Sequence, residues 1–273
     1  MTSASNMENY ATEIVDNIQT FMERTADPRT KSWFLMSSPG PLLTILVAYL
    51  YFCLSAGPRF MKNRKPFELR GVMIAYNAAQ VIFSGYLVWE GLQGGWLHEY
   101  DYTCQPVDYS ENPVAMRMAR ACWCYFFCKV IELLDTIFFV LRKKDNQVSF
   151  LHLYHHTMMP FCAWIGTRYL PGGHGTLLGV INSFVHIVMY GYYLLAALGP
   201  QVQKYLWWKK YITTLQLAQF CLVFAHSAQL LVVECNYPKS IVVLLGANAT
   251  FFFYLFSNFY RKTYLKTPHA KVQ

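Results

Sequence analysis

Apolar residues fill seven stretches of the chain, and short polar segments separate them. A transmembrane helix needs about 20 mostly apolar residues, because the hydrocarbon core of a bilayer is roughly 30 Å thick. The pattern therefore predicts an all-α, polytopic membrane protein with seven transmembrane helices. Since no internal repeat interrupts the chain, we predict a single domain, residues 1–273. The predicted spans are 38–57, 70–90, 117–141, 147–168, 174–198, 211–233 and 240–260.

Composition agrees with this pattern. Hydrophobic residues make up 55% of the chain and charged residues only 14%, whereas soluble domains carry roughly 25% charge. The net charge of +8 does not indicate a nucleic-acid partner, because the basic residues form short runs between apolar stretches. Most of them fall in residues 58–70, 142–146, 199–210 and the tail from 261. The positive-inside rule therefore predicts a lumenal or outside N-terminus and a cytosolic C-terminus.

Two of the eight cysteines, Cys104 and Cys235, lie outside the predicted spans. Both fall on the predicted lumenal side, where disulfides form. We predict that they pair, and the alternative is two free thiols that share a face. The other six cysteines lie within the spans, where a free cysteine usually acts as a small hydrophobic residue.

Four of the predicted spans carry polar residues at helical spacing, so that each set shares one face. With the predicted topology, all four sets fall in the cytosolic half of the membrane. Polar groups are costly against lipid, so we expect these faces to meet around a site. The alternative is a polar network that only joins the helices. The sets are Lys129, Glu132, Asp135 and Thr136; His152, His155 and His156; Asn182, His186, Met189, Tyr190 and Tyr193; and Thr213, Gln216 and Gln219.

The histidines suggest two kinds of chemistry. Imidazoles bind metals, and His152, His155, His156 and His186 could supply a mononuclear site. Neutral imidazole is also a nucleophile and a base near physiological pH. We favour the second interpretation and predict no metal, while the four-ligand site stays open.

At these residues the sequence resembles the fatty acid elongases that extend very-long-chain acyl-CoA. Four motifs carry the resemblance, namely residues 129–136, 152–156, 182–193 and 213–219. Residues 203–210 look like the animal branch, nearest the members that act on saturated and monounsaturated chains. The resemblance implies an endoplasmic reticulum membrane protein in which six of seven helices form a barrel-like bundle around an acyl tunnel.

The implied reaction is that of a 3-oxoacyl-CoA synthase. This acyltransferase condenses acyl-CoA with malonyl-CoA to give 3-oxoacyl-CoA, CO2 and CoA, without a cofactor. A homodimer and the other enzymes of the elongation cycle are possible partners. Near the C-terminus, His269 stands where a dilysine retrieval signal that includes Lys271 would need a second lysine.

We predict a ping-pong route in which His155 takes the acyl group as an acyl-imidazole. His186 would handle protons or orient the malonyl group, with Asn182 and His152 holding the rings. The predicted catalytic residues are His152, His155, His156, Asn182 and His186. The predicted substrate-binding residues are Lys129, Glu132, Asp135, Arg142, Tyr190, Tyr192, Tyr193, Lys209, Lys210, Gln216, Gln219 and Arg261.

Several alternatives accompany these assignments. Arg142, Lys209, Lys210 and Arg261 could be ordinary cytosolic charge, and Lys129 could simply pair with Glu132 or Asp135. Tyr192 and Tyr193 could be packing residues. Cys128 is a rival nucleophile, and seven spans with an outside N-terminus also suit a receptor.

Overall fold

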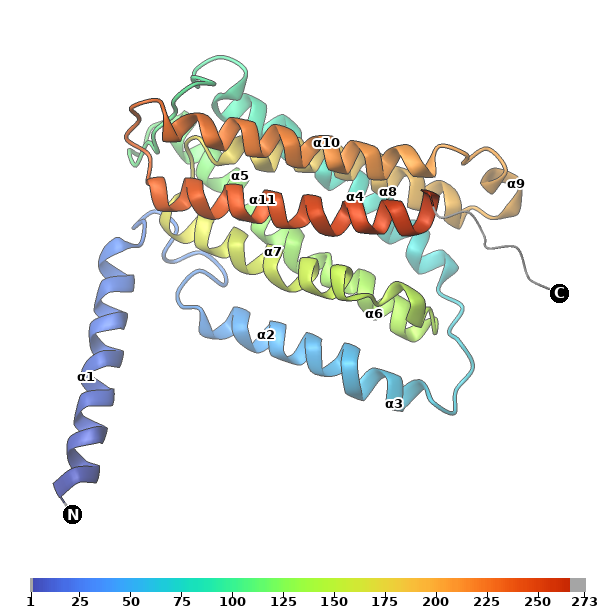
Figure 1. Cartoon of the computed structure of the whole chain (residues 1–273), viewed down its shortest axis with the longest axis horizontal. Helices are drawn as coiled ribbons and strands as arrows, with labels where there is room; N and C mark the ends of the chain where they lie inside the picture. Colours follow the sequence, from blue (N-terminus) through green and yellow to red (C-terminus); the bar gives the residue numbers. More distant parts are fainter. Residues whose placement is uncertain (1, 266–273) are drawn as a thin grey trace.

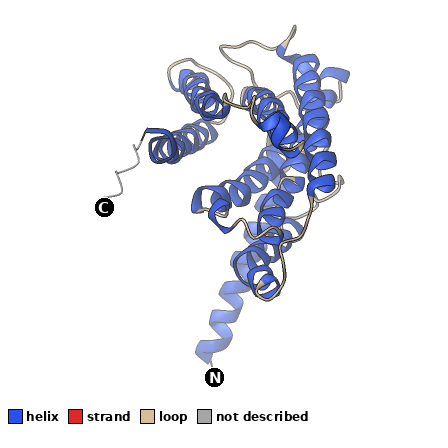
Figure 2. Ribbon diagram, turned by 90° about the vertical axis from the view of Figure 1, so that its right-hand side faces the viewer, coloured by secondary structure: helices blue, strands red, loops and turns tan. Residues whose placement is uncertain are grey.

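The computed structural model describes the backbone of residues 2–265, so His269 and Lys271 lie outside the described residues. Within that range every regular element is a helix (Figures 1 and 2), which confirms the all-α prediction. The elements are α1 (Thr2–Thr25), α2 (Gly40–Tyr51), η1 (Phe52–Ala56), α3 (Gly57–Met61), α4 (Arg70–Gly91), η2 (Leu92–Trp96), α5 (Pro113–Ile131), α6 (Leu133–Leu141), η3 (Asp145–Gln147), α7 (Phe150–Tyr169), α8 (Thr176–Ala197), α9 (Pro200–Gln203), α10 (Lys209–Ala228), η4 (Gln229–Leu231), α11 (Lys239–Tyr260) and η5 (Arg261–Leu265).

Four helical segments in the described range are long and apolar enough to cross a membrane. They are Gly40–Met61, Arg70–Trp96, Thr176–Ala197 and Lys239–Leu265. Three further long segments, α5 with α6, α7 and α10, lie alongside them (Figure 1). These segments coincide with three of the predicted spans, and each carries one of the polar sets that lower its mean hydropathy.

Local sequence explains where two of these helices begin. At the start of α5, the Asn112 side chain accepts a hydrogen bond from the Ala115 amide, and Pro113 takes the first helical position. Pro113 fits there because it lacks the N–H that would be unpaired at a helix start. At the start of α7, the Ser149 hydroxyl accepts from the His152 amide at 3.3 Å. The histidine motif therefore occupies the capped first turns of α7.

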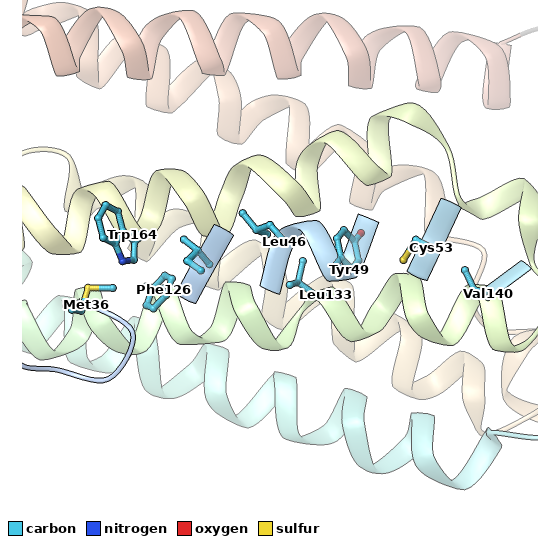
Figure 3. Close-up of a cluster of buried hydrophobic side chains, with 9 residues drawn as sticks. Met36, Leu46, Tyr49, Cys53, Phe126, Leu133, Val140 and Trp164 are labelled. Carbon is cyan, nitrogen blue, oxygen red and sulfur yellow. The ribbon is translucent and has the colours of Figure 1, made fainter. Parts of the chain in front are cut away.

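The long helices run side by side in the bundle, with α4 along α8, α5 along α7 and α10 along α11 (Figure 1). The first segment, α2 to α3, lies at the edge of this bundle. Its apolar face forms a buried cluster with side chains of α5, α6 and α7 (Figure 3). The nine buried members are Met36, Leu42, Leu46, Tyr49, Cys53, Phe126, Leu133, Val140 and Trp164.

The two ends of the bundle differ in chemistry. We call the end with loops 62–69, 142–149 and 198–208 the basic end, and the end with loops 97–112, 170–175 and 232–238 the disulfide end. A disulfide joins Cys104 to Cys235 at the latter, with an S–S distance of 2.02 Å. Gly173, at φ 70°, lies so close to loop 97–112 that a Cβ would meet the Val107 nitrogen at 2.9 Å. Helix α1 leaves the bundle from this end (Figure 1).

Candidate active site

The histidine motif of α7 forms a packed group of rings. The centroids of His152 and His156 are 4.2 Å apart, and those of His155 and His156 are 5.1 Å apart. His155 also packs edge-on against Phe252 of α11, with the ring centroids 5.4 Å apart. The spacing of three and four residues thus places all three rings together, as expected for one helix face.

A chain of hydrogen bonds connects the motif to the first helical segment. His152 Nε2 lies 2.9 Å from Thr136 Oγ1, and Thr136 Oγ1 lies 2.7 Å from the Tyr49 hydroxyl. Thr136 is fully buried and Tyr49 is 4% exposed. Because the hydrogen bond to Thr136 occupies one ring nitrogen of His152, it fixes the orientation of that ring.

Glu132 joins a lysine and a histidine deep in the bundle. Lys129 Nζ and His186 Nδ1 lie 2.9 and 3.1 Å from the same oxygen, Glu132 Oε1. Lys129 therefore pairs with Glu132 rather than with Asp135. The Glu132 carboxylate accepts a hydrogen bond from His186 Nδ1 and so holds the ring. In a neutral imidazole the proton is then on Nδ1, and the lone pair is on Nε2. Glu132 itself lies at the break between α5 and α6.

Asp135 and Asn182 both have protein partners. The Tyr190 hydroxyl donates to Asp135 Oδ2 at 2.7 Å. Asn182 accepts from the Tyr125 hydroxyl at 2.9 Å, and its Nδ2 lies 3.4 Å from Gln219 Oε1. Asn182 is therefore held by α5 and α10, and neither of these bonds goes to a histidine ring.

Two cavities meet at the histidine motif. A cavity of about 910 Å³ extends toward the basic end; we call it the polar cavity because the histidine, amide and charged side chains of the site line it. A cavity of about 200 Å³, the apolar cavity, extends toward the disulfide end. The first is within the usual size range of small-molecule sites. Both cavities are lined by His155, Asn182, Gln219 and Phe220. His155 thus lies where a polar chamber passes into an apolar one.

Most of the predicted site residues line the polar cavity. Four do not line either cavity. Lys129 and Glu132 pair with each other and Glu132 contacts His186, Lys210 lies in the first turn of α10, and Arg261 begins η5. The predicted residues that line the polar cavity are Asp135, Arg142, His152, His155, His156, Asn182, His186, Tyr190, Tyr192, Tyr193, Lys209, Gln216 and Gln219.

Helix α4 contributes residues that lie outside the four predicted polar sets. Tyr76 and Asn77 line the polar cavity, and Asn77, Gln80 and Ser84 are all buried. Their spacing of three and four residues in an otherwise apolar helix is the signal that would have found them. Tyr49, in contrast, is an isolated tyrosine that no periodic pattern distinguishes.

The geometry bears on two alternatives, Cys128 as the nucleophile and a metal site. Cys128 is 2% exposed, lines neither cavity, and directs its thiol at Gln80 and Glu132. It is therefore poorly placed to meet a substrate. Among the side chains that the structure describes, no group of three or more His, Cys, Asp or Glu residues could hold a metal ion.

Comparison with known proteins identifies the family. The family model described as "ELO: GNS1/SUR4 family" matches residues 34–272. A very long chain fatty acid elongase of Aedes aegypti is 52% identical over 258 residues, which cover 94% of this chain and 72% of the relative. Very long chain fatty acid elongase 1 of Mus musculus is 50% identical over 256 residues, covering 93% and 92%. The chain, a multi-pass membrane protein, therefore belongs to the ELO (GNS1/SUR4) family of fatty acid elongases.

Proposed function

We propose that this protein is the condensing enzyme of very-long-chain fatty acid elongation, which joins acyl-CoA to malonyl-CoA and gives 3-oxoacyl-CoA, CO2 and CoA. The position of His155 at the junction of the two cavities carries the proposal. An acyl-CoA has a polar CoA portion and an apolar chain, with the reactive thioester between them. Such a molecule matches a polar chamber and an apolar chamber that meet at a nucleophile.

The proposed mechanism has two half-reactions. A ring nitrogen of His155 attacks the thioester carbonyl, the C–S bond breaks, and CoA leaves with a proton. Malonyl-CoA then loses CO2, and the electron pair of the broken C–C bond passes to the carbon next to the thioester. That carbon attacks the acyl-imidazole carbonyl, the C–N bond to the ring breaks, and His155 takes up a proton from water to become neutral again. Covalent catalysis of this kind replaces one difficult step with two easier ones.

His186 is the proposed proton-transfer or orienting group. Its Nδ1 is bound to Glu132, so Nε2 is the nitrogen that faces away from that carboxylate. The ammonium of Lys129 neutralises the charge of the Glu132 carboxylate inside the membrane, and the ion pair holds that carboxylate next to His186. This arrangement resembles the oriented bases of other nucleophilic enzymes, in which a third group fixes the ring.

We further propose that the seven long helical segments after α1, which lie at the predicted spans, cross the endoplasmic reticulum membrane, and that six of them surround the two cavities. The basic end then faces the cytosol, and the disulfide end faces the lumen. Arg142 and Lys209 line the polar cavity, and guanidinium and ammonium groups bind phosphates well. They are the proposed contacts for CoA, whereas Lys210 and Arg261 contribute only general positive charge.

The test is purified protein incubated with acyl-CoA alone, followed by intact-mass spectrometry. We expect an added acyl group on the wild-type chain and none on His155→Ala. His98→Gln is the matched control, since His98 is exposed beyond η2 and lies in neither cavity. Labelled malonyl-CoA added afterwards should release CO2. An acyl adduct that persists in His155→Ala would disprove the assignment of the nucleophile.

A further inference from the structure

One buried amide in the polar cavity has an atom without a partner. Asn77 is 3% exposed and lines that cavity, and its Nδ2 has no hydrogen-bond acceptor. Only three buried side-chain atoms in the described residues share this condition, and the other two, on Arg168 and His174, do not border the polar cavity. Buried donors are nearly always paired, so an exception needs an explanation.

The depth of Asn77 can be fixed from the helix that faces it. Arg70 begins α4 and donates to the carbonyl oxygens of Ala197 and Leu198, at the end of α8. Asn77 lies seven residues from Arg70, and Tyr190 lies seven residues from Ala197, so both are roughly 10 Å inside the bundle. The packing of Tyr76 against Tyr190, with ring centroids 6.1 Å apart, agrees with this alignment.

His186 is one helical turn deeper than Tyr190. Asn77 therefore lies about one turn from His186, on the side of the basic end. It lines the polar cavity but not the apolar one. A ligand group at Asn77 is thus part of the CoA side of a bound thioester and not part of its acyl chain.

We infer that the Asn77 amide donates a hydrogen bond to the thioester oxygen of malonyl-CoA; this rests on the function proposed above. When the C–C bond to the carboxylate breaks and CO2 leaves, negative charge develops on that oxygen. A fixed donor aimed at developing charge in a site sheltered from water lowers the barrier. Asn182 is less suited to this task, because its amide is already bonded to Tyr125 and Gln219.

The uncharged nature of the donor also matters. A lysine or arginine at this depth would stabilise the malonyl carboxylate before it is lost, and so would oppose decarboxylation. The cationic side chains that line the polar cavity are Arg70, Arg142 and Lys209, which lie at the basic end. A neutral amide instead favours the state in which charge has moved to the thioester oxygen.

The decisive variant is Asn77→Leu, which keeps the size of the side chain and removes the unpaired donor. Ser84→Ala is the matched control, because Ser84 is a buried polar residue of the same helix that lines neither cavity. Three quantities are measured on each purified protein: the thermal midpoint, the rate of acyl-enzyme formation from acyl-CoA alone, and the rate of CO2 release from labelled malonyl-CoA.

For Asn77→Leu we expect a thermal midpoint equal to or above that of wild type, an unchanged rate of acylation, and a loss of about 100-fold in CO2 release. Ser84→Ala should keep both rates. Unchanged CO2 release, an equal loss in both steps, or a lowered midpoint that parallels the loss of activity would overturn the inference. If Asn77→Leu does not fold, Asn77→Ser is measured in its place; because its hydroxyl is still a donor, CO2 release should fall by less than about 100-fold while acylation stays unchanged. Wild-type protein that neither binds an acyl group nor releases CO2 would instead refute the proposed function.

Discussion

Removal of the Cys104–Cys235 disulfide should destabilise the protein without disabling its site. The bond joins loop 97–112 to loop 232–238 and closes a segment with a sequence separation of 131 residues. Neither cysteine lines a cavity. The double variant Cys104→Ser/Cys235→Ser is the appropriate perturbation, because a single substitution would leave the other cysteine as a free thiol.

The expected magnitude follows from the length of the closed segment. The chain-entropy model gives about 5 kcal/mol for a loop of this length. That figure is an upper limit here, since α8 within the segment is apolar enough to stay in the membrane or the micelle when packing is lost. We therefore expect a loss of about 2–4 kcal/mol. With a shift of about 2–4 °C per kcal/mol for large domains, the thermal midpoint should fall by roughly 5–15 °C.

The measurement is a thermal melt in one detergent, followed by intrinsic tryptophan fluorescence. Cys221→Ser is the control, because Cys221 is an exposed free cysteine of α10, and its midpoint should stay at the wild-type value. Condensing activity of the double variant, assayed well below its midpoint, should remain close to that of wild type. A midpoint equal to that of wild type would refute the reasoning from loop closure.

Three further substitutions test the hydrogen-bond network. Tyr49→Phe removes the hydroxyl that is bonded to Thr136, which in turn is bonded to His152, so kcat should fall while KM changes little in a steady-state assay. Tyr51→Phe, at an exposed position of the same helix, is the control and should match wild type. Glu132→Gln leaves the Lys129 ammonium buried without its carboxylate and should cost about 3–5 kcal/mol in a thermal or denaturant melt; replacing Lys129 as well should recover part of that loss. Cys128→Ser should retain condensing activity, and a complete loss in a folded variant would restore the cysteine as the candidate nucleophile.

The sequence was sufficient to predict the positions of the long helices and the histidine face of α7 that forms one wall of the site. Long apolar stretches predict helices directly, and the structure has a long helical segment at each predicted position. The histidine motif was visible because three rings at spacings of three and four must share a face. The expectation that several polar faces meet came from the cost of polar groups in lipid, and the polar cavity does collect residues from α6, α7, α8 and α10.

Other parts of the site depend on contacts between distant segments. Tyr49 belongs to a span that looks uniformly apolar, and its role exists only because α2 packs where Thr136 faces it. The exclusion of Lys129 and Glu132 from the cavity has the same origin. They have helical spacing to Asp135, but Glu132 lies at the break between α5 and α6 and contacts Lys129 and His186, and only Asp135 lines the cavity. Spacing along one helix cannot predict such a break.

The distribution of charged side chains from the basic end inward would orient a bound ligand. Arg142 and Lys209 border the polar cavity at the helix ends, where they can attract an anionic ligand from solution. Deeper in the membrane, the buried ammonium of Lys129 is matched by Glu132, so this pair adds no net charge at that depth. A ligand that enters with its phosphates would therefore have that charge bound at the mouth, while its thioester advances among imidazoles, amides and the Asp135 carboxyl group that Tyr190 holds. Chemistry on a neutral thioester, rather than on a phosphate, is what this distribution favours.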